Sequence, residues 1–322
     1  ERANKARDGR INDIRACIGC NQACIGHMIN GFGISCIQRP ETGRELRYGA
    51  RVPAEQPRTV FVARGGPAGM KAACVAAERG HQVVLFERSG VLGGQVQLAQ
   101  LLPGRSEFGG LITNFTREME LAGVDVRRNT ELDRAMIENE APDAVIIATG
   151  ASVHHPPIEG GDEAHVVDAW QVLREEVNVG QSVVIADWRA DWIGLGLAEK
   201  LASAGCRVRL AVNGTMAGQT IEAIVRDRWI GDLQKLGVEV IPYVRLFGVD
   251  SENVYLQHLI NDEAIICEEV DTLVTALGQG SETALETDLR GWTGDVFLAG
   301  DCLNPRTAEE AVFEGLKAGF AV

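Results

Sequence analysis

The feature that most constrains the fold of this chain is a strand–turn–helix–strand pattern that occurs twice, at residues 59–87 and 182–212. In each copy an apolar strand leads through a turn into a helix, and a second apolar strand follows. Parallel strands joined by helices predict an α/β fold with two Rossmann-like domains. The expected elements are strands at 59–63, 82–86, 182–186 and 207–212, and helices at 70–79 and 193–204.

The turn of the first copy is typical of a dinucleotide-binding site. Its glycines let the backbone approach a pyrophosphate, and the N–H groups and dipole at the helix N-terminus favour an anion. Glu87, at the end of the second strand, lies where an acid accepts hydrogen bonds from an adenosine ribose. The candidate binding residues are Gly65, Gly66, Ala68, Gly69, Glu87 and Arg88.

Arg64 breaks this pattern, because it occupies the first position of G-x-G-x-x-G, where glycine is expected. A Cβ and a long side chain are expected to strain the tight turn. Arg64 could pair with a phosphate, but we favour a damaged site or a sequencing variant. We therefore expect Arg64→Gly to raise nucleotide occupancy.

The turn of the second copy, at residues 187–194, keeps only one glycine, Gly194. Asp187 and Asp191 would face a diphosphate, and like charges oppose binding. The two tryptophans of this turn leave less room for the backbone to approach a ligand. We therefore expect this nicotinamide-type site to be degenerate, and NAD(P)H is a doubtful cofactor.

A group of four cysteines lies near the N-terminus, with gaps of two, three and eleven residues between Cys17, Cys20, Cys24 and Cys36. Close thiolates on a tight loop, with one returning thiolate, can enclose a single iron–sulfur cluster. A structural zinc site also accepts four thiolates, and spacing alone does not separate the two. His27 lies inside this loop, where a structural role is favoured over a ligand role.

Residues 15–24 resemble the 4Fe–4S loop of the 2,4-dienoyl-CoA reductase, enoate reductase and trimethylamine dehydrogenase group of NADH:flavin oxidoreductases, which includes N-methylproline demethylase-like enzymes. Those enzymes carry an old-yellow-enzyme-like FMN barrel, then the cluster loop, then a pyridine-nucleotide-disulfide-reductase-like module. The resemblance covers essentially the whole chain. The cysteine spacing looks more like the dienoyl-CoA reductase branch. The degenerate second turn looks more like the amine dehydrogenase and demethylase branch.

The resemblance implies further contacts to FAD, or to ADP in its place. Residues 89–95 look like the glycine-rich stretch after the second strand, and residues 143–150 look like the strand and turn that close the first nucleotide half. Residues 294–301 resemble the second FAD motif, with Asp301 positioned for the ribityl chain. Arg105 is expected near the flavin or the barrel interface. The further candidate residues are Gly94, Gln95, Arg105, Ala148, Thr149, Gly150, Gly300 and Asp301.

Charge and composition restrict the class of protein. The 322 residues carry a net charge of −14, which argues against nucleic acid or an anionic membrane as a partner. We find no apolar run long enough to span a bilayer. The remaining cysteines are interpreted as buried free thiols of a reducing cytosol, so a cytoplasmic location is expected. The chain opens without methionine and has no stretch that could form a barrel, so we interpret it as the C-terminal portion of a longer enzyme.

The expected domains are a 4Fe–4S-binding segment at 1–55, an FAD- or ADP-binding domain at 56–153 and 280–322, and a degenerate NAD(P)-binding-like domain at 154–279. The expected function is electron relay between an FMN barrel, absent here, and an acceptor in amine dehydrogenation or demethylation. The expected partners are the barrel portion, an electron-transferring flavoprotein and a second copy of the chain. The alternatives are an NAD(P)H-dependent 2,4-dienoyl-CoA or enoate reductase module and a non-catalytic ADP-binding docking module. No catalytic residue is assigned, because the substrate would bind in the barrel.

Overall fold

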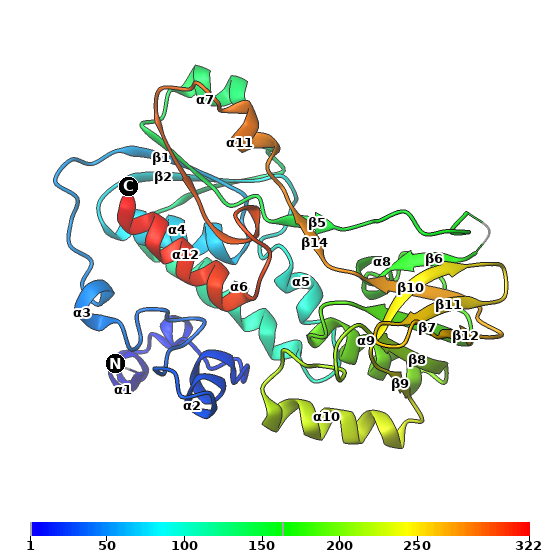
Figure 1. Ribbon diagram of the computed structural model, residues 1–322. Helices are drawn as coiled ribbons and strands as arrows, with labels where there is room; N and C mark the ends of the chain where they lie inside the picture. Colours follow the sequence, from blue (N-terminus) through cyan, green and yellow to red (C-terminus); the bar gives the residue numbers. More distant parts are fainter. Residues whose placement is uncertain (1, 163) are drawn as a thin grey trace. The chain divides into compact units, whose positions relative to one another are not determined.

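The computed structural model describes residues 2–162 and 164–322, and the chain divides into two compact α/β units (Figure 1). Unit 1 comprises Glu1–Gln100, Glu107–Ser152 and Gly280–Val322, and unit 2 comprises Leu101–Ser106 and Val153–Gln279. These units differ from the expected domains in three respects, the smallest of which is that Val153 lies in unit 2. Residues 101–106 belong to unit 2, and residues 1–55 are part of unit 1 rather than a domain of their own.

Unit 1 is built on a five-stranded sheet in the order β15-β4-β1-β2-β3, in which all neighbouring strands are parallel. Its strands are β1 Thr59–Ala63, β2 Gln82–Glu87, β3 Asp125–Arg128, β4 Ala144–Ile147 and β15 Asp295–Leu298. Ala63 pairs with Phe86 on one side and with Ile147 on the other. The carboxyl ends of β1, β2 and β4 therefore meet at the same edge of the sheet, which is where ligands bind in folds of this class.

Helices cover both faces of this sheet, because the apolar side chains of β1 alternate between them. Val60 and Val62 face a core formed with α4, α6 and α12, whereas Phe61 faces a second core formed with α7 and α11. The helices of this part are α4 Pro67–Glu78, α5 Val96–Ala99, α6 Gly110–Ala122, α7 Arg134–Glu140, α11 Ala284–Asp288 and α12 Ala308–Ala321, with 3-10 turns at Ser106–Gly109 and Gly300–Cys302. Helix α4 begins three residues earlier than the sequence predicts, because Pro67 is well suited to the first helical position.

The cysteine-containing segment at the N-terminus packs on the core of unit 1. Its side chains Ile18, Ala23 and Ile37 are buried in the same apolar cluster as Phe115 of α6. Its short elements are α1 Arg2–Arg7, a 3-10 turn Ile11–Asp13, a π-helical turn Gln22–Gly26, α2 His27–Ile29 and α3 Glu45–Tyr48. The segment is therefore ordered by burial against unit 1.

Unit 2 contains a second five-stranded parallel sheet in the order β6-β13-β7-β8-β9. A three-stranded antiparallel sheet, β10-β11-β12, packs its apolar side chains against this sheet and was not predicted from the sequence. The elements of unit 2 are β6 Val166–Asp168, α8 Ala169–Leu173, β7 Ser182–Asp187, α9 Trp192–Ser203, β8 Arg207–Val212, α10 Ala223–Lys235, β9 Glu239–Ile241, β10 Val244–Val249, β11 Val254–His258, β12 Ala264–Cys267 and β13 Thr272–Ala276.

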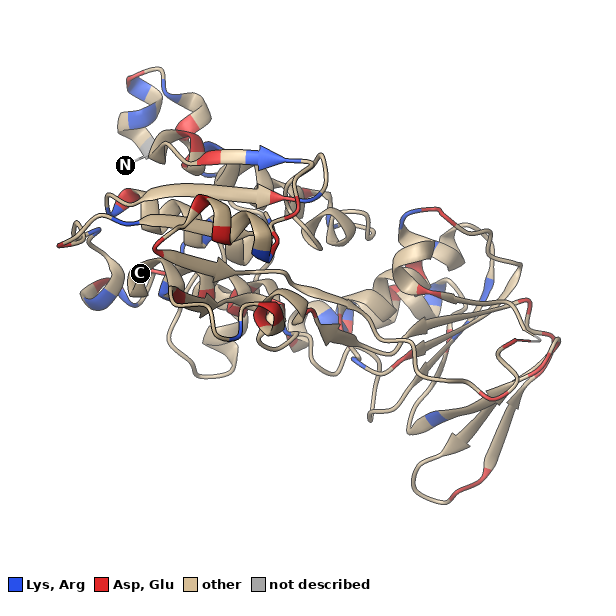
Figure 2. Cartoon of the chain, turned by 90° about the horizontal axis from the view of Figure 1, so that it is seen from above, with Lys and Arg blue, Asp and Glu red and all other residues tan. Residues whose placement is uncertain are grey.

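Two strands, β5 Ala151–Val153 and β14 Gln279–Ser281, pair with each other where the chain passes between the units. Acidic and basic residues are interspersed over the ribbons of both units (Figure 2). Among the described residues, no helix is both long enough and apolar enough to cross a bilayer.

Candidate functional site

The glycine-rich turn of unit 1 lies between β1 and α4, as the sequence predicts. A Cβ on Gly69 would lie 2.1 Å from the carbonyl oxygen of Arg64, so only glycine allows the helix to start this close to the strand. Gly66 is the N-cap of α4 and, as a glycine, has no side chain that could cap the first turn of the helix. The backbone N–H groups at this helix start are therefore suited to a pyrophosphate. Gly65 and Ala68 are buried beside them.

Glu87 ties this turn to the end of β2 and is only 6% exposed. Its Oε2 accepts a hydrogen bond from the backbone N–H of Gly65 at 2.8 Å. Its Oε1 accepts hydrogen bonds from the backbone N–H and the hydroxyl of Ser89, both at 2.8 Å. A ligand ribose could share these oxygens, since a carboxylate has about four acceptor sites.

Gln95 and Asp301, which are far apart in the sequence, are brought together. The Nε2 group of Gln95 donates a hydrogen bond to Oδ2 of Asp301 at 2.8 Å. Gly94 approaches Gly66 so closely that a Cβ on Gly94 would lie 3.2 Å from the Cα of Gly66. Gly300 has a φ of +80°, and its N–H donates to Glu314 of α12 at 2.9 Å.

The turn after β4 also reaches this edge of the sheet. Ala148 is buried, and its N–H donates to the carbonyl oxygen of Ala63 at 3.1 Å. The hydroxyl of Thr149 donates to the carbonyl oxygen of Glu282 at 2.7 Å. Gly150 follows with a φ of +79°. The carboxyl ends of β1, β2 and β4 thus gather most of the candidate nucleotide-binding residues.

Arg105 is not part of unit 1. It belongs to unit 2, where its guanidinium carbon lies 3.6 Å from the centroid of the Trp192 ring. Its approach to a flavin or to a barrel stays a prediction.

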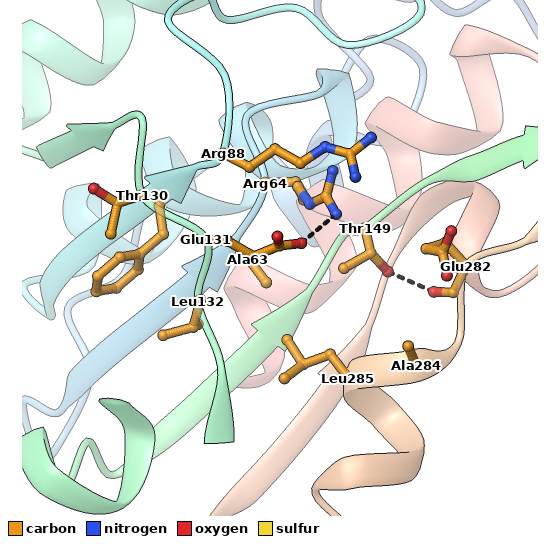
Figure 3. A pocket seen from close by; sticks show the side chains of 11 residues that line it. Ala63, Arg64, Arg88, Thr130, Glu131, Leu132, Thr149, Glu282, Ala284 and Leu285 are labelled. Carbon is orange, nitrogen blue, oxygen red and sulfur yellow. Dashed lines mark hydrogen bonds and ion pairs between the residues drawn. The ribbon is translucent and has the colours of Figure 1, made fainter. Parts of the chain in front are cut away.

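Arg64 adopts a φ of +80°, a region that L-residues other than glycine rarely enter. The expected strain at the first glycine position is therefore present in the backbone. Its side chain lies in a cavity of about 180 Å³ at the edge of the sheet and forms an ion pair with Glu131 at 2.8 Å (Figure 3). Arg88 and Thr149 line the same cavity.

The four cysteines of the N-terminal segment are all free thiols; Cys17 is exposed and the other three are half-buried. Burial raises the pKa of Cys20 to about 11, and the neighbouring thiols of Cys24, Cys36 and Cys17 add to the rise. No group of three or more metal-binding side chains is assembled within the described ranges. The donor set itself fits a 4Fe–4S cluster, since such clusters are held by four thiolates.

The cysteine loop is held against α12 by His27. Its Nε2 lies 2.9 Å from Oε1 of Glu309 in the first turn of α12, and its Nδ1 lies 2.9 Å from the carbonyl oxygen of Gly33. Both ring nitrogens therefore have protein partners, which suits a structural role.

The second nucleotide-type turn, between β7 and α9, is filled by acidic side chains of the chain itself. Asp187 is fully buried, and its Oδ1 accepts hydrogen bonds from the N–H groups of Arg189 and Ala190 at 3.1 and 3.0 Å. A Cβ on Gly194 would lie 2.0 Å from Oδ2 of Asp187, so this carboxyl group lies against the start of the helix. Asp191 caps α9 by accepting the N–H of Ile193 at 2.9 Å.

Burial raises the pKa of Asp187 well above its usual range, and nearby Asp191 adds to the rise. Oδ2 of Asp187 is buried without a hydrogen-bond partner in the described part of the chain. Asp187 therefore places a buried carboxyl group against the start of α9.

The two parallel sheets, the glycine-rich turn and the Gln95–Asp301 pair together define a Rossmann-type oxidoreductase module. A model of the family described as pyridine nucleotide-disulphide oxidoreductase matches residues 59–315. This chain belongs to that family, and its FAD-type Rossmann fold agrees with the resemblance drawn from the sequence.

Curated relatives include reductases, oxidases and demethylases. The chain is 36% identical to a probable N-methylproline demethylase of Rhizobium meliloti, over 99% of this chain and 48% of the relative. It is 34% identical to a bilirubin reductase of Mediterraneibacter gnavus, over 98% of this chain and 48% of the relative. It is 30% identical to an NADH oxidase of Thermoanaerobacter brockii, over 99% and 49%. The chain thus spans about half the length of the curated relatives it matches.

The chain also matches about half the length of solved structures of larger enzymes. A 2-naphthoyl-CoA reductase matches all of this chain and 48% of its own with a TM-score of 0.91 at 28% identity. A histamine dehydrogenase from Rhizobium sp. 4-9 matches 98% of this chain and 52% of its own with a TM-score of 0.90 at 25% identity.

Proposed function

We infer that this chain is the electron-transfer portion of a flavin and iron–sulfur oxidoreductase. Two observations support this role: the chain belongs to an oxidoreductase family, and it spans about half of reductases and a demethylase that are roughly twice as long. A flavin and an iron–sulfur cluster, when bound, supply a two-electron and a one-electron carrier.

Cys17, Cys20, Cys24 and Cys36 would hold the 4Fe–4S cluster. Their segment is anchored through the buried side chains Ile18, Ala23 and Ile37, so the four thiols are carried on the same compact unit as the flavin-type turn.

The glycine-rich turn before α4 would bind the pyrophosphate of FAD, or of ADP in its place. Glu87 would accept hydrogen bonds from the ribose, and the Gln95–Asp301 pair would meet the ribityl chain if the ligand is FAD. Gly66 supports this role, because it has open space where a Cβ would be.

An exposed apolar face on the cysteine loop supports docking of an FMN-barrel portion. Met28, Ile29, Phe32 and Ile34 lie within seven residues of one another and are 54%, 47%, 66% and 51% exposed. Soluble chains seldom leave such a group uncovered. The relatives are about twice as long as this chain, so a further domain of the same enzyme is the expected occupant.

The observation that carries the direction of electron flow is Asp187 at the start of α9. Its carboxyl group lies against Gly194, where a nicotinamide dinucleotide would place its pyrophosphate. NAD(P)H is therefore not the expected electron donor. Electrons would enter from the barrel during amine dehydrogenation or demethylation and leave to a protein acceptor such as an electron-transferring flavoprotein.

A reductase that receives electrons from NAD(P)H is the second candidate. The names of two relatives, bilirubin reductase and NADH oxidase, favour it, as does the spacing of the four cysteines. A docking module that binds ADP without redox chemistry is favoured only by the strained Arg64.

The test is an anaerobic titration of the chain after it has been reconstituted with iron and sulfide and loaded with FAD. We expect NADH and NADPH to leave the flavin absorbance unchanged and dithionite to bleach it. Rapid bleaching by either nicotinamide would favour the reductase. Iron and acid-labile sulfide should both be retained by the chain and lost in Cys36→Ser; retention of zinc without sulfide would contradict the cluster.

A further inference from the structure

We propose that the Arg64 side chain closes the adenosine end of the nucleotide site in unit 1 and is held there by its ion pair with Glu131. A nucleotide must displace this ion pair in order to bind. The proposal rests on the nucleotide-binding role proposed above for unit 1. It assigns to a single side chain the control of affinity at that site.

The backbone conformation of Arg64 determines the direction of its side chain. Its N–H donates to the carbonyl oxygen of Phe86 at 2.7 Å, so the residue continues the β1–β2 ladder beyond the end of β1. At a φ of +80° the Cβ takes a direction that the glycine of the usual pattern leaves empty. The side chain consequently enters the space above the carboxyl ends of the strands.

Candidate nucleotide-binding residues surround the Arg64 side chain. Figure 3 shows the guanidinium groups of Arg64 and Arg88 in one cavity, with Glu131 and Thr149 beside them. Arg88 directly follows Glu87, the candidate ribose partner, and Thr149 belongs to the candidate turn after β4. Arg64 therefore lies among residues that an adenosine would contact.

The cavity that Arg64 lines leaves little room for a ligand. The cavity measures about 180 Å³ with Arg64 in place, whereas small-molecule sites usually offer roughly 300–1,000 Å³. The Arg64 side chain lines this cavity and is only 16% exposed. An adenosine group can enter only if this side chain moves out.

The ion pair that holds Arg64 in this cavity is weak. Glu131 is 61% exposed, and an ion pair with one solvated partner is weak. Burial lowers the pKa of Arg64, and the charge of Arg88 lowers it further. The charged guanidinium is therefore disfavoured in this cavity. The closed arrangement can therefore be opened by a ligand, at the expense of affinity.

A phosphate-binding role for Arg64 predicts the opposite sign. If the guanidinium held a phosphate, its removal would weaken nucleotide binding, because a charge-assisted hydrogen bond would be lost.

The experiment measures dissociation constants of FAD and ADP by calorimetry for the nucleotide-free full chain and four variants. Arg64→Gly and Arg64→Asn both remove the side chain and tolerate the positive φ. Glu131→Gln removes the ion pair and keeps the Arg64 side chain. Glu138→Gln is the matched control, because Glu138 is 54% exposed, similar to Glu131 at 61%, and forms an ion pair with Arg134 on α7.

We expect Arg64→Gly and Arg64→Asn to bind both nucleotides about tenfold more tightly, which corresponds to about 1.4 kcal/mol. Glu131→Gln should lie between these variants and the original chain, and Glu138→Gln should match the original chain. Weaker binding by the Arg64 variants, or affinities equal to the original chain, would overturn the proposal and leave the nucleotide-binding role intact. Failure of every protein, including Arg64→Gly, to bind either nucleotide would overturn that role as well.

Discussion

Asp187 is the buried acidic residue of the turn between β7 and α9. Its carboxyl group lies against Gly194 in the first turn of that helix. It is fully buried, and its Oδ2 has no hydrogen-bond partner among the described residues. Burial therefore holds the pKa of Asp187 well above its usual range.

The raised pKa of Asp187 predicts a pH-dependent stability. A folded-state pKa above the unfolded value of about 3.9 means that stability falls as pH rises from there toward the folded pKa. Asp187→Asn cannot ionise, so we expect it to be more stable than the original chain at pH 8 by roughly 1–3 kcal/mol. The difference should nearly vanish at pH 4. Thermal unfolding at both pH values checks this, and a variant that is less stable at pH 8 would contradict it.

Among the elements, helices α4 and α12 determine the geometry of the nucleotide turn. A Cβ on Gly315 would lie 2.3 Å from the carbonyl oxygen of Ala68, and a Cβ on Gly319 would lie 2.7 Å from that of Ala72. The two helices approach this closely because α12 presents glycine along the contact. This contact positions the turn at Gly300 and Asp301 against the start of α4.

Gly315→Ala should therefore destabilise unit 1 by about 1–3 kcal/mol, the usual cost of overpacking. The matched control is Gly231→Ala in α10, where a Cβ would meet nothing within 4 Å. The control should stabilise the chain by roughly 0.4–1 kcal/mol, because alanine restricts the unfolded state. Urea unfolding of both variants gives the comparison, and similar changes in the two would show that the helix contact is not the cause.

On the scale of the whole molecule, a buried ion pair joins the cysteine-containing segment to helix α4 of the same unit. Nζ of Lys71, on α4, lies 2.8 Å from Oε1 of Glu41, and the two side chains are only 3% and 7% exposed. Arg51 also pairs with Glu41 and, at 2.5 Å, with Glu78. Burial alone would raise the pKa of Glu41, but Lys71 and Arg51 outweigh burial and hold it at about 2.

Glu41→Gln should therefore destabilise unit 1 by about 3–5 kcal/mol at pH 7, because it leaves the Lys71 charge buried without its partner. Glu41 has a folded pKa below its unfolded value of about 4.3, so its contribution is present above that value and lost as pH falls toward 2. The difference between variant and original chain should shrink below pH 4. Glu78→Gln, a more exposed partner of Arg51, should change stability by less than about 1 kcal/mol. Equal losses in the two variants would contradict this account.

The local elements could be predicted from the sequence, because each depends on residues close together in the chain. The strand expected at 59–63 is β1 Thr59–Ala63, and the strand expected at 82–86 extends by one residue to Glu87. The turn at 64–69 was recognised from its glycines. The class of fold follows from the order of these elements, since parallel strands joined by helices have few arrangements.

The partners of individual side chains were decided only by the tertiary structure. Lys71 meets Glu41 across 30 residues and Gln95 meets Asp301 across 206, and no local pattern marks either pair. The sequence marked Asp187 and Arg64 as departures from the usual turns, but not the burial of the one or the contact of the other with Glu131. Local backbone preferences act over a few residues, whereas burial and side-chain pairing exist only once distant segments have packed together.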